Sequence, residues 1–264
     1  MSTSSLILFE VRNGIATLTF NRPDKRNAMS DDMRTEFIHA LEQVAADKYI
    51  KALVLTGAGK GFCAGGDIGG MQKRMTAPAG EVGFNGWHRQ QRVHHTQSLL
   101  HTCPKPVIAA VNGAASGLGA DTALACDFII ASEWASFSWS YIHRGIVPDG
   151  GGMYFLPRRV GLPKAKELIF TGRKVDADEA LALGIVDRKT SSETLLADAQ
   201  AWAAELGKGS ATALALTKTI LNQSFERSAH EVFAQGSQAQ GICYTSSEHR
   251  ASVEAFLAKT AAKE

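Results

Sequence analysis

Two glycine-rich turns, each directly after a run of apolar residues, limit most strongly what this chain can fold into. The first turn is 61–67 (GFCAGGD), after the apolar run 52–56, and the second is 112–119 (NGAASGLG), after the run 107–111. Both lead into segments with helical periodicity. Each turn therefore presents backbone N–H groups at the carboxyl end of a strand and the start of a helix, where negative charge is stabilised. Two such turns facing one point would form an oxyanion hole.

The rest of the N-terminal pattern predicts an α/β fold. Segments 6–11 and 15–20 alternate apolar and polar residues around Asn13-Gly14, which indicates a hairpin. Ser30 is predicted to cap a helix. Continuous apolar runs that alternate with helical segments favour a largely parallel sheet covered on both faces. These runs lie at 52–56, 107–111 and 128–131.

Two further segments differ from this pattern. Segment 76–85, which holds Pro78, Gly80 and Gly83, is predicted to be a loose and mobile loop. From about residue 191 onward the chain reads as helical, with helices expected at 191–206, 211–225, 228–244 and 247–259. We therefore expect an α/β core over 1–190 and a helical C-terminal region over 191–264, used for assembly and as a cover for the active site.

Composition narrows the class of protein. The formal net charge is +2 and no long basic run is present, so nucleic acid is not an expected partner, although an anionic ligand is compatible. The four cysteines lie far apart without a CxxC pair, so no metal site is expected. The chain has neither an apolar signal segment at its start nor a run of about 18 apolar residues. We expect an intracellular, cytoplasmic, soluble protein without a membrane partner.

Motifs along nearly the whole chain resemble the enoyl-CoA hydratase/isomerase (crotonase) superfamily. The resembling segments are 21–23 (NRP) with 27–29 (NAM), 62–68 (FCAGGDI), 106–113 (PVIAAVNG), 125–127 (ACD), Phe137, 145–151 (GIVPDGG), 171–172 (TG), 180–186 (ALALGIV) and 255–259 (AFLAK). The resemblance implies a crotonase-like spiral of ββα units. It also implies C-terminal helices that build a homotrimer or homohexamer, and an enzyme of fatty acid metabolism that acts on an acyl-CoA.

The resemblance also assigns binding residues. The thioester oxygen would accept hydrogen bonds from the amides of Gly66 and Leu118, and Leu118 departs from the glycine that is usual there. Coenzyme A would enter as part of the substrate, and no separate cofactor is implied. Its contacts would fall on the following residues: Arg26, Ala28, Ala64, Asp67 and Ile68.

The acid and base groups decide which reaction such an enzyme catalyses. Hydratases of this family carry two glutamates, at positions that Asp121 and Tyr141 occupy here. A tyrosine is a poor general base near neutral pH, and aspartate is one methylene shorter than glutamate. Family isomerases and an aryl-CoA dehalogenase use a carboxylate at the position of Asp149. The resemblance therefore favours double-bond isomerisation through Asp149, with Asp121 as a second catalytic candidate.

Three alternatives stay open at this point. One is an enoyl-CoA hydratase in which Asp121 holds the water. Another is aryl-CoA chemistry with Asp149 as nucleophile; His94 matches a histidine of the dehalogenase, whose aromatic pocket would need to come from Trp139, Tyr141, Trp87 and Phe84. The last is a CoA-thioester binder that has lost its catalytic acids. Apart from these alternatives, Tyr141 could line the acyl pocket or donate a hydrogen bond.

Overall fold

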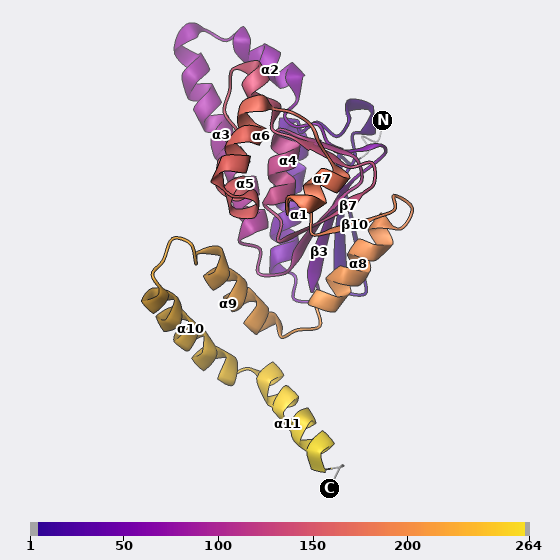
Figure 1. The fold of residues 1–264 in the computed structure, drawn as a ribbon, viewed down its shortest axis with the longest axis vertical. Coiled ribbons are helices and arrows are strands. Elements are labelled where there is room, and N and C mark those ends of the chain that lie inside the picture. The colour runs from indigo at the N-terminus through magenta and orange to yellow at the C-terminus, as the bar shows by residue number, and fades with distance from the viewer. Residues whose placement is uncertain (1–4, 262–264) are drawn as a thin grey trace.

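Two β-sheets and the helices around them form the body of the molecule in the computed structural model, which describes residues 5–261 (Figure 1). The main sheet has the strand order β1-β2-β3-β5-β7-β10, and the small sheet has the order β4-β6-β8-β9. Neighbouring strands are parallel, apart from the antiparallel pairs β1–β2 and β8–β9. The strands are β1 (Ile7–Arg12), β2 (Ile15–Phe20), β3 (Ala52–Gly57), β4 (Gly61–Cys63), β5 (Val107–Val111), β6 (Ala114–Ser116), β7 (Phe128–Ser132), β8 (Ser136–Ser138), β9 (Val175–Asp176) and β10 (Arg188–Thr190).

The chain repeats one pattern three times: a main-sheet strand, a small-sheet strand and then a helical segment. The units are β3-β4 with α2 and α3, β5-β6 with α4, and β7-β8 with η2 and α5. This repeat confirms the predicted α/β spiral of ββα units. The helical elements are η1 (Pro23–Lys25), α1 (Asp31–Ala46), α2 (Ile68–Met75), α3 (Ala79–His101), α4 (Leu118–Leu124), η2 (Ser140–Arg144), α5 (Gly152–Val160), α6 (Leu162–Thr171), α7 (Ala177–Ala182), α8 (Leu195–Leu206), α9 (Ala211–Asn222), α10 (Ala229–Tyr244) and α11 (Ser247–Ala261).

Both faces of the main sheet are buried, which is why its central strands read as continuous apolar runs. Successive side chains of a strand point to opposite faces. Val54 and Ile108 accordingly join the cluster that α8 covers with Trp202, whereas Leu53 and Leu55 belong to the larger cluster on the other face. The predicted strands at 52–56, 107–111 and 128–131 are confirmed as β3, β5 and β7, within one residue at each end.

Local signals near the N-terminus are also confirmed. Asn13 and Gly14 both have positive φ, 52° and 78°, in the turn that joins β1 to β2. The Ser30 side chain accepts a hydrogen bond from the Met33 amide at 3.2 Å and caps α1. This cap fixes the start of the helix that follows the cavity-lining segment of η1 and Ala28.

The loop predicted for segment 76–85 is confined to residues 76–78, and the prediction is wrong for 79–85, because α3 begins at Ala79 and runs on to His101. Gly80 and Gly83 therefore lie within a helix. Each glycine costs about 1 kcal/mol relative to alanine there, and tertiary packing overrides such a propensity. The packing comes from the C-terminal half of α3, where Val93 and Leu100 are buried in the core.

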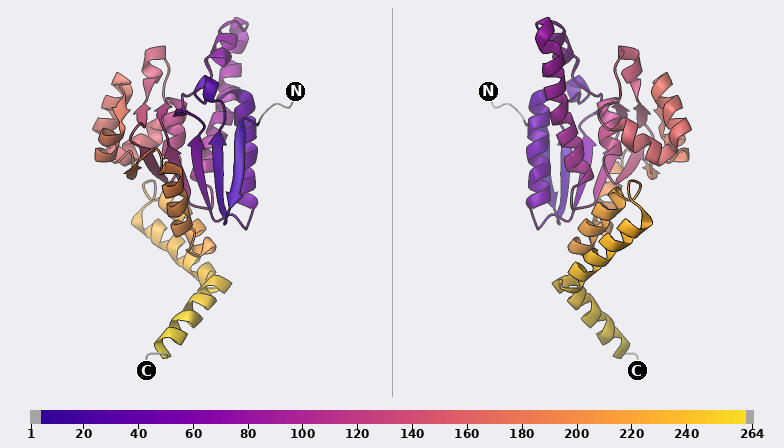
Figure 2. Two further views of the ribbon diagram at one scale, coloured as in Figure 1. Left: turned by 90° about the vertical axis from the view of Figure 1, so that its right-hand side faces the viewer. Right: turned by 90° about the vertical axis from the view of Figure 1, so that its left-hand side faces the viewer.

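The C-terminal helices divide into one that belongs to the body and three that project from it. α8 packs on the main sheet, whereas α9, α10 and α11 extend away from it, at the end opposite α2 and α3 (Figures 1 and 2). α9 is fixed by Lys218, which donates to Asp127 at 2.7 Å, and by Asn222, which donates to the His101 carbonyl at 2.7 Å. None of the residues described for these three helices is buried. No helix within residues 5–261 is long and apolar enough to cross a membrane.

Candidate active site

A cavity of about 1160 Å³ opens between η1, the β4–α2 turn, the β6–α4 turn and η2. Of the described residues in its wall one is acidic, Asp67, and it is paired with Arg22 at 2.9 Å, which lowers the pKa of that carboxyl. The wall also carries further basic side chains: Lys25, Arg26, Lys60, Arg144 and Lys174. A cavity with this excess of positive charge suits a ligand that carries phosphate groups.

The two glycine-rich turns meet in this cavity. Gly65 has φ of 96°, and a side chain at that position would lie 2.8 Å from the Ser116 carbonyl oxygen, so glycine permits the close approach of the two turns. Met29 donates to the Gly65 carbonyl and accepts from the Asp67 amide. This bridge leaves the N–H of Gly66, between them, directed away from Met29. Leu118 is the first residue of α4, where a backbone N–H has no partner within its helix. Both amides belong to residues of the cavity wall.

All five residues predicted to contact coenzyme A lie in the cavity wall: Arg26, Ala28, Ala64, Asp67 and Ile68. Asn27 holds their loop in shape from beneath. Its buried side chain donates to the carbonyls of Ala58 and Gly61 at 2.9 and 2.7 Å and accepts from the Arg22 amide. The Ala64 amide in turn donates to the Arg26 carbonyl at 3.0 Å. The two loops thus form one framed surface.

Asp121 lies beneath the cavity rather than in its wall. The residue is fully buried on α4. Its carboxyl accepts hydrogen bonds from the Tyr141 hydroxyl at 2.6 Å and from Trp139 Nε1 at 3.0 Å. Burial raises the pKa of Asp121 to about 7, and burial together with the neighbouring carboxyl raises the pKa of Tyr141 well above its usual value. Tyr141 is also buried, but its ring reaches the cavity wall. Asp121 and Tyr141, which occupy the two positions assigned above to the glutamates of family hydratases, are therefore hydrogen-bonded to each other.

Asp149 is partly exposed in the turn before α5. Burial raises the pKa of this carboxyl. The rise is reduced by a hydrogen bond from its own backbone amide and by the charges of His94 and Arg89. His94 and Arg89 both belong to α3, so α3 passes close to the turn that carries Asp149. His94 itself is exposed. His94 thus lies near enough to act on the charge of Asp149, but neither residue lies in the wall of the cavity described above.

Comparison with known proteins decides the family. The model of the enoyl-CoA hydratase/isomerase family matches residues 10–263. The chain belongs to the enoyl-CoA hydratase/isomerase family. It is 36% identical to the 1,2-epoxyphenylacetyl-CoA isomerase of Escherichia coli (strain K12) over 253 residues, 96% of this chain and 95% of that protein. It is 34% identical to the short-chain-enoyl-CoA hydratase of Clostridium acetobutylicum over 254 residues, again 96% and 95% of the two chains.

Solved structures agree with this enoyl-CoA hydratase/isomerase assignment. An enoyl-CoA hydratase/isomerase from Cupriavidus metallidurans CH34 superposes with a TM-score of 0.89 at 35% identity, covering 98% of this chain and 96% of that one. An enoyl-CoA hydratase from Bacillus anthracis gives 0.88 at 30% identity, covering 96% of each chain. The predicted crotonase-like fold and the predicted enzyme class, enoyl-CoA hydratase/isomerase, are confirmed.

A row of serines in the cavity of this hydratase/isomerase family member escaped the sequence analysis. Ser116 Oγ lies 2.8 Å from Ser138 Oγ and 3.4 Å from Ser140 Oγ, and all three line the cavity beside Leu118. Part of the signal was present, because Ser136 and Ser138 alternate along the chain, and alternate residues of a strand share one face, whereas Ser140 begins η2. The Gly117 amide also donates to the Ser138 carbonyl at 2.8 Å, so β8 supports the turn that ends at Leu118.

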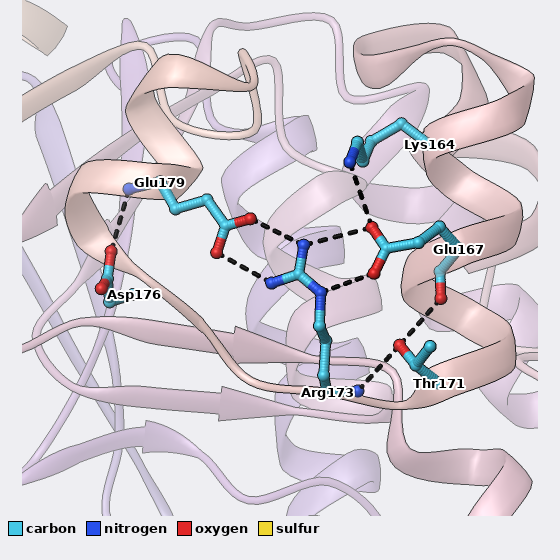
Figure 3. A network of polar contacts seen from close by, with 6 residues as sticks. All are labelled: Lys164, Glu167, Thr171, Arg173, Asp176 and Glu179. Atoms are coloured by element: carbon cyan, nitrogen blue, oxygen red, sulfur yellow. Dashed lines mark hydrogen bonds and ion pairs between the residues drawn. The ribbon is translucent and has the colours of Figure 1, made fainter.

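A paired guanidinium fixes another wall of the cavity. Arg173 forms ion pairs with Glu167 of α6 and with Glu179 of α7, and the closest N–O distance in each pair is 2.6 Å (Figure 3). Its neighbours Gly172 and Lys174 both line the cavity. Because both carboxylates are held by one side chain, α6 and α7 keep a fixed separation on this side of the cavity.

The aromatic pocket suggested by the sequence does not form from the four residues named for it. Trp139 is fully buried and donates to Asp121, whereas Phe84 and Trp87 are 66% and 59% exposed on α3. Tyr141 alone of the four lines the cavity. Their sequence positions did not show that α3 turns Phe84 and Trp87 outward. Within the described part of the chain, no group of three or more His, Cys, Asp or Glu side chains is placed to hold a metal ion.

Proposed function

We propose that this enzyme moves a double bond within an acyl-CoA thioester and that Asp149 carries the proton. The observation that supports this choice is the bond between Tyr141 and Asp121 at 2.6 Å, in a site where Asp121 is fully buried. A carboxyl in that position has no access to a water in the cavity. Asp149 also lies outside the cavity wall, but it is partly exposed, and the next residue, Gly150, packs against the side chain of Leu118 in that wall, so Asp149 is the better candidate for the base.

The proposed reaction begins with binding of the CoA phosphates by the basic wall, at residues such as Lys25, Arg26 and Lys60. The thioester oxygen then lies at the amides of Gly66 and Leu118. The Asp149 carboxylate removes a proton from the α or γ carbon, and the negative charge of the resulting enolate is stabilised by the two amides. The protonated carboxyl returns the proton to the other carbon. The proposal uses no cofactor, because coenzyme A is part of the substrate.

The electrostatics of Asp149 fit this role. A general base works best when its pKa lies close to the operating pH. Burial raises the pKa of Asp149 toward that range, while His94 and Arg89 limit the rise and favour the ionised form. The Escherichia coli relative named as an isomerase adds support for isomerisation, although other relatives are named hydratases.

Isotope exchange tests the proposal. The wild type, incubated with an enoyl-CoA in heavy water, should incorporate deuterium at the α or γ carbon. Asp149→Asn keeps the size of the side chain but removes the base, so exchange should fall by roughly 100-fold or more while CoA-thioester binding changes little. Asp121→Asn is the matched control and should lose less.

Other outcomes identify the alternatives. Loss of activity in Asp121→Asn alone, with a hydrated product, would support a hydratase. Halide release from a haloaryl-CoA that depends on Asp149 would support nucleophilic aryl-CoA chemistry. Saturable binding of CoA thioesters without exchange in the wild type would indicate a binder.

We also propose that the protein assembles as a homotrimer or homohexamer in the cytoplasm. α9–α11 and the loop between α9 and α10 leave large apolar side chains uncovered, and such faces are usually buried by another copy. They include Leu221, Phe225, Phe233, Ile242, Tyr244, Phe256 and Leu257. No residue beyond Lys174 among those described lines the cavity of a single chain, so a cover from the C-terminal helices would come from a neighbouring copy. Four free cysteines fit a reducing compartment.

A further inference from the structure

The Asp121 carboxyl joins three parts of the site that are distant in sequence. It accepts hydrogen bonds from the Tyr141 hydroxyl at 2.6 Å and from Trp139 Nε1 at 3.0 Å, and both donors lie in the segment after β8. Gly152, at the start of α5, packs directly against the same carboxyl. Asp121 itself lies on the first turn of α4, three residues after Leu118. One buried side chain thus connects α4, the Trp139–Tyr141 segment and the turn that carries Asp149.

The turn after Asp149 is packed against this carboxyl without spare room. A side-chain carbon at Gly150 would lie 2.7 Å from Asp121 Oδ2 and 2.6 Å from Leu118 Cδ1. At Gly152 it would lie 2.5 Å from Asp121 Oδ1. These distances mean that the backbone of the turn rests directly on Asp121 and on Leu118. A shift of the carboxyl would therefore move both the turn that bears Asp149 and the residue whose amide faces the thioester.

We infer that Asp121 is a positioning residue, which is fixed by its hydrogen bonds to Tyr141 and Trp139 and, by its packing against Gly150 and Gly152, holds the Asp149 turn in register with the Leu118 amide. The inference rests on the proposed function, since it assumes that Asp149 and the Leu118 amide act on the substrate. It assigns Asp121 no proton transfer. The Tyr141 hydroxyl and Trp139 Nε1 each donate to one of its oxygens, and its full burial separates it from the cavity.

Two substitutions at the same residue distinguish positioning from base catalysis. In Asp121→Asn the amide oxygen can accept from Trp139, the amide nitrogen can donate to the Tyr141 oxygen, and the size of the side chain is kept, so both connections and the packing are preserved. Asp121→Ala removes every acceptor. A positioning role predicts that Asn retains kcat within about 10-fold, and that Ala loses about 100-fold in kcat with little change in KM, because misplacement of reacting groups acts on turnover.

A third variant keeps the test decisive if the alanine protein does not fold. Tyr141→Phe removes one donor and leaves the carboxylate in place. Positioning predicts that Tyr141→Phe loses more kcat than Asp121→Asn, whereas a base at Asp121 predicts the reverse order. Activity is expressed per folded protein, measured by circular dichroism, so that loss of stability alone does not lower it.

The outcomes separate this inference from the proposed function. Equal losses of kcat in Asp121→Asn and Asp121→Ala would overturn positioning, and so would a folded Asp121→Ala protein with wild-type kcat. Failure of the proposed function would give a different result: Asp149→Asn would turn over an acyl-CoA as fast as the wild type. The kcat values of Asp121→Asn, Asp121→Ala and Tyr141→Phe can then be compared on that acyl-CoA.

Discussion

Replacing Gly152 with alanine adds one methyl group where α5 begins against the buried Asp121 carboxyl. The new carbon would lie 2.5 Å from Asp121 Oδ1 and 3.0 Å from Trp139 Cδ1. An ordinary contact needs about 3.5 Å or more, so the carboxyl, the indole or the helix start must move by about 1 Å. The neighbours are fully buried and have little freedom to move. Overpacking of this kind typically costs about 1–3 kcal/mol of unfolding free energy.

Gly86→Ala provides a matched control. Gly86 lies inside α3, and a side-chain carbon there would meet no described atom within 4 Å. Alanine is favoured over glycine in a helix interior by about 0.5–1 kcal/mol, so this variant should be more stable than the wild type. The same chemical change is thus expected to have opposite signs at the two positions.

Urea unfolding measures both effects. The three proteins are compared at one fixed protein concentration, because assembly adds a concentration-dependent contribution to stability. We expect the midpoint of Gly152→Ala below, and that of Gly86→Ala above, the wild-type midpoint. A Gly152→Ala protein as stable as the wild type would refute the close packing of the turn on Asp121.

Three further predictions concern pH, the oxyanion hole and assembly. Because the folded-state pKa of Asp121 is raised from 3.8 to about 7, its protonated form stabilises the fold at low pH, and this contribution is lost as pH rises from about 4 to about 7. The loss is at most about 4 kcal/mol of unfolding free energy. Denaturation of the wild type at several pH values should show it. If the unfolding free energy of Asp121→Asn fell with pH as steeply as that of the wild type, this assignment would be contradicted. Gly66→Pro removes one oxyanion donor and should reduce turnover by about 100-fold or more, so a folded variant with near-normal turnover would exclude that donor. Light scattering at micromolar concentration should give three or six copies, and a stable monomer would contradict the assembly proposal.

The sequence predicted those parts of the molecule that depend on short-range patterns. The hairpin at Asn13, the cap at Ser30 and the buried strands follow from residues within one element. The two glycine turns could be placed together because the carboxyl ends of neighbouring parallel strands lie at one edge of a sheet. The residues expected around coenzyme A accordingly lie in one cavity.

The parts that sequence could not predict depend on contacts between distant residues. Asp121 is buried by Trp139 and Tyr141, which lie 18 and 20 residues further on, and no local pattern reveals that contact. The helix that replaces the expected loop at 79–85 is favoured by packing of its C-terminal half, around Val93.

The order of the strands has a consequence for how the chain can fold. In both sheets the strands lie side by side in the order in which they occur along the chain, β1-β2-β3-β5-β7-β10 and β4-β6-β8-β9. Each new strand therefore pairs with the edge that the preceding unit has just formed, and no strand has to be inserted between two that are already paired. During synthesis the N-terminal part of a chain is available for folding first. This spiral can grow outward in the same direction, one ββα unit at a time, and Asp121 reaches its partners only when the third unit, with Trp139 and Tyr141, has emerged.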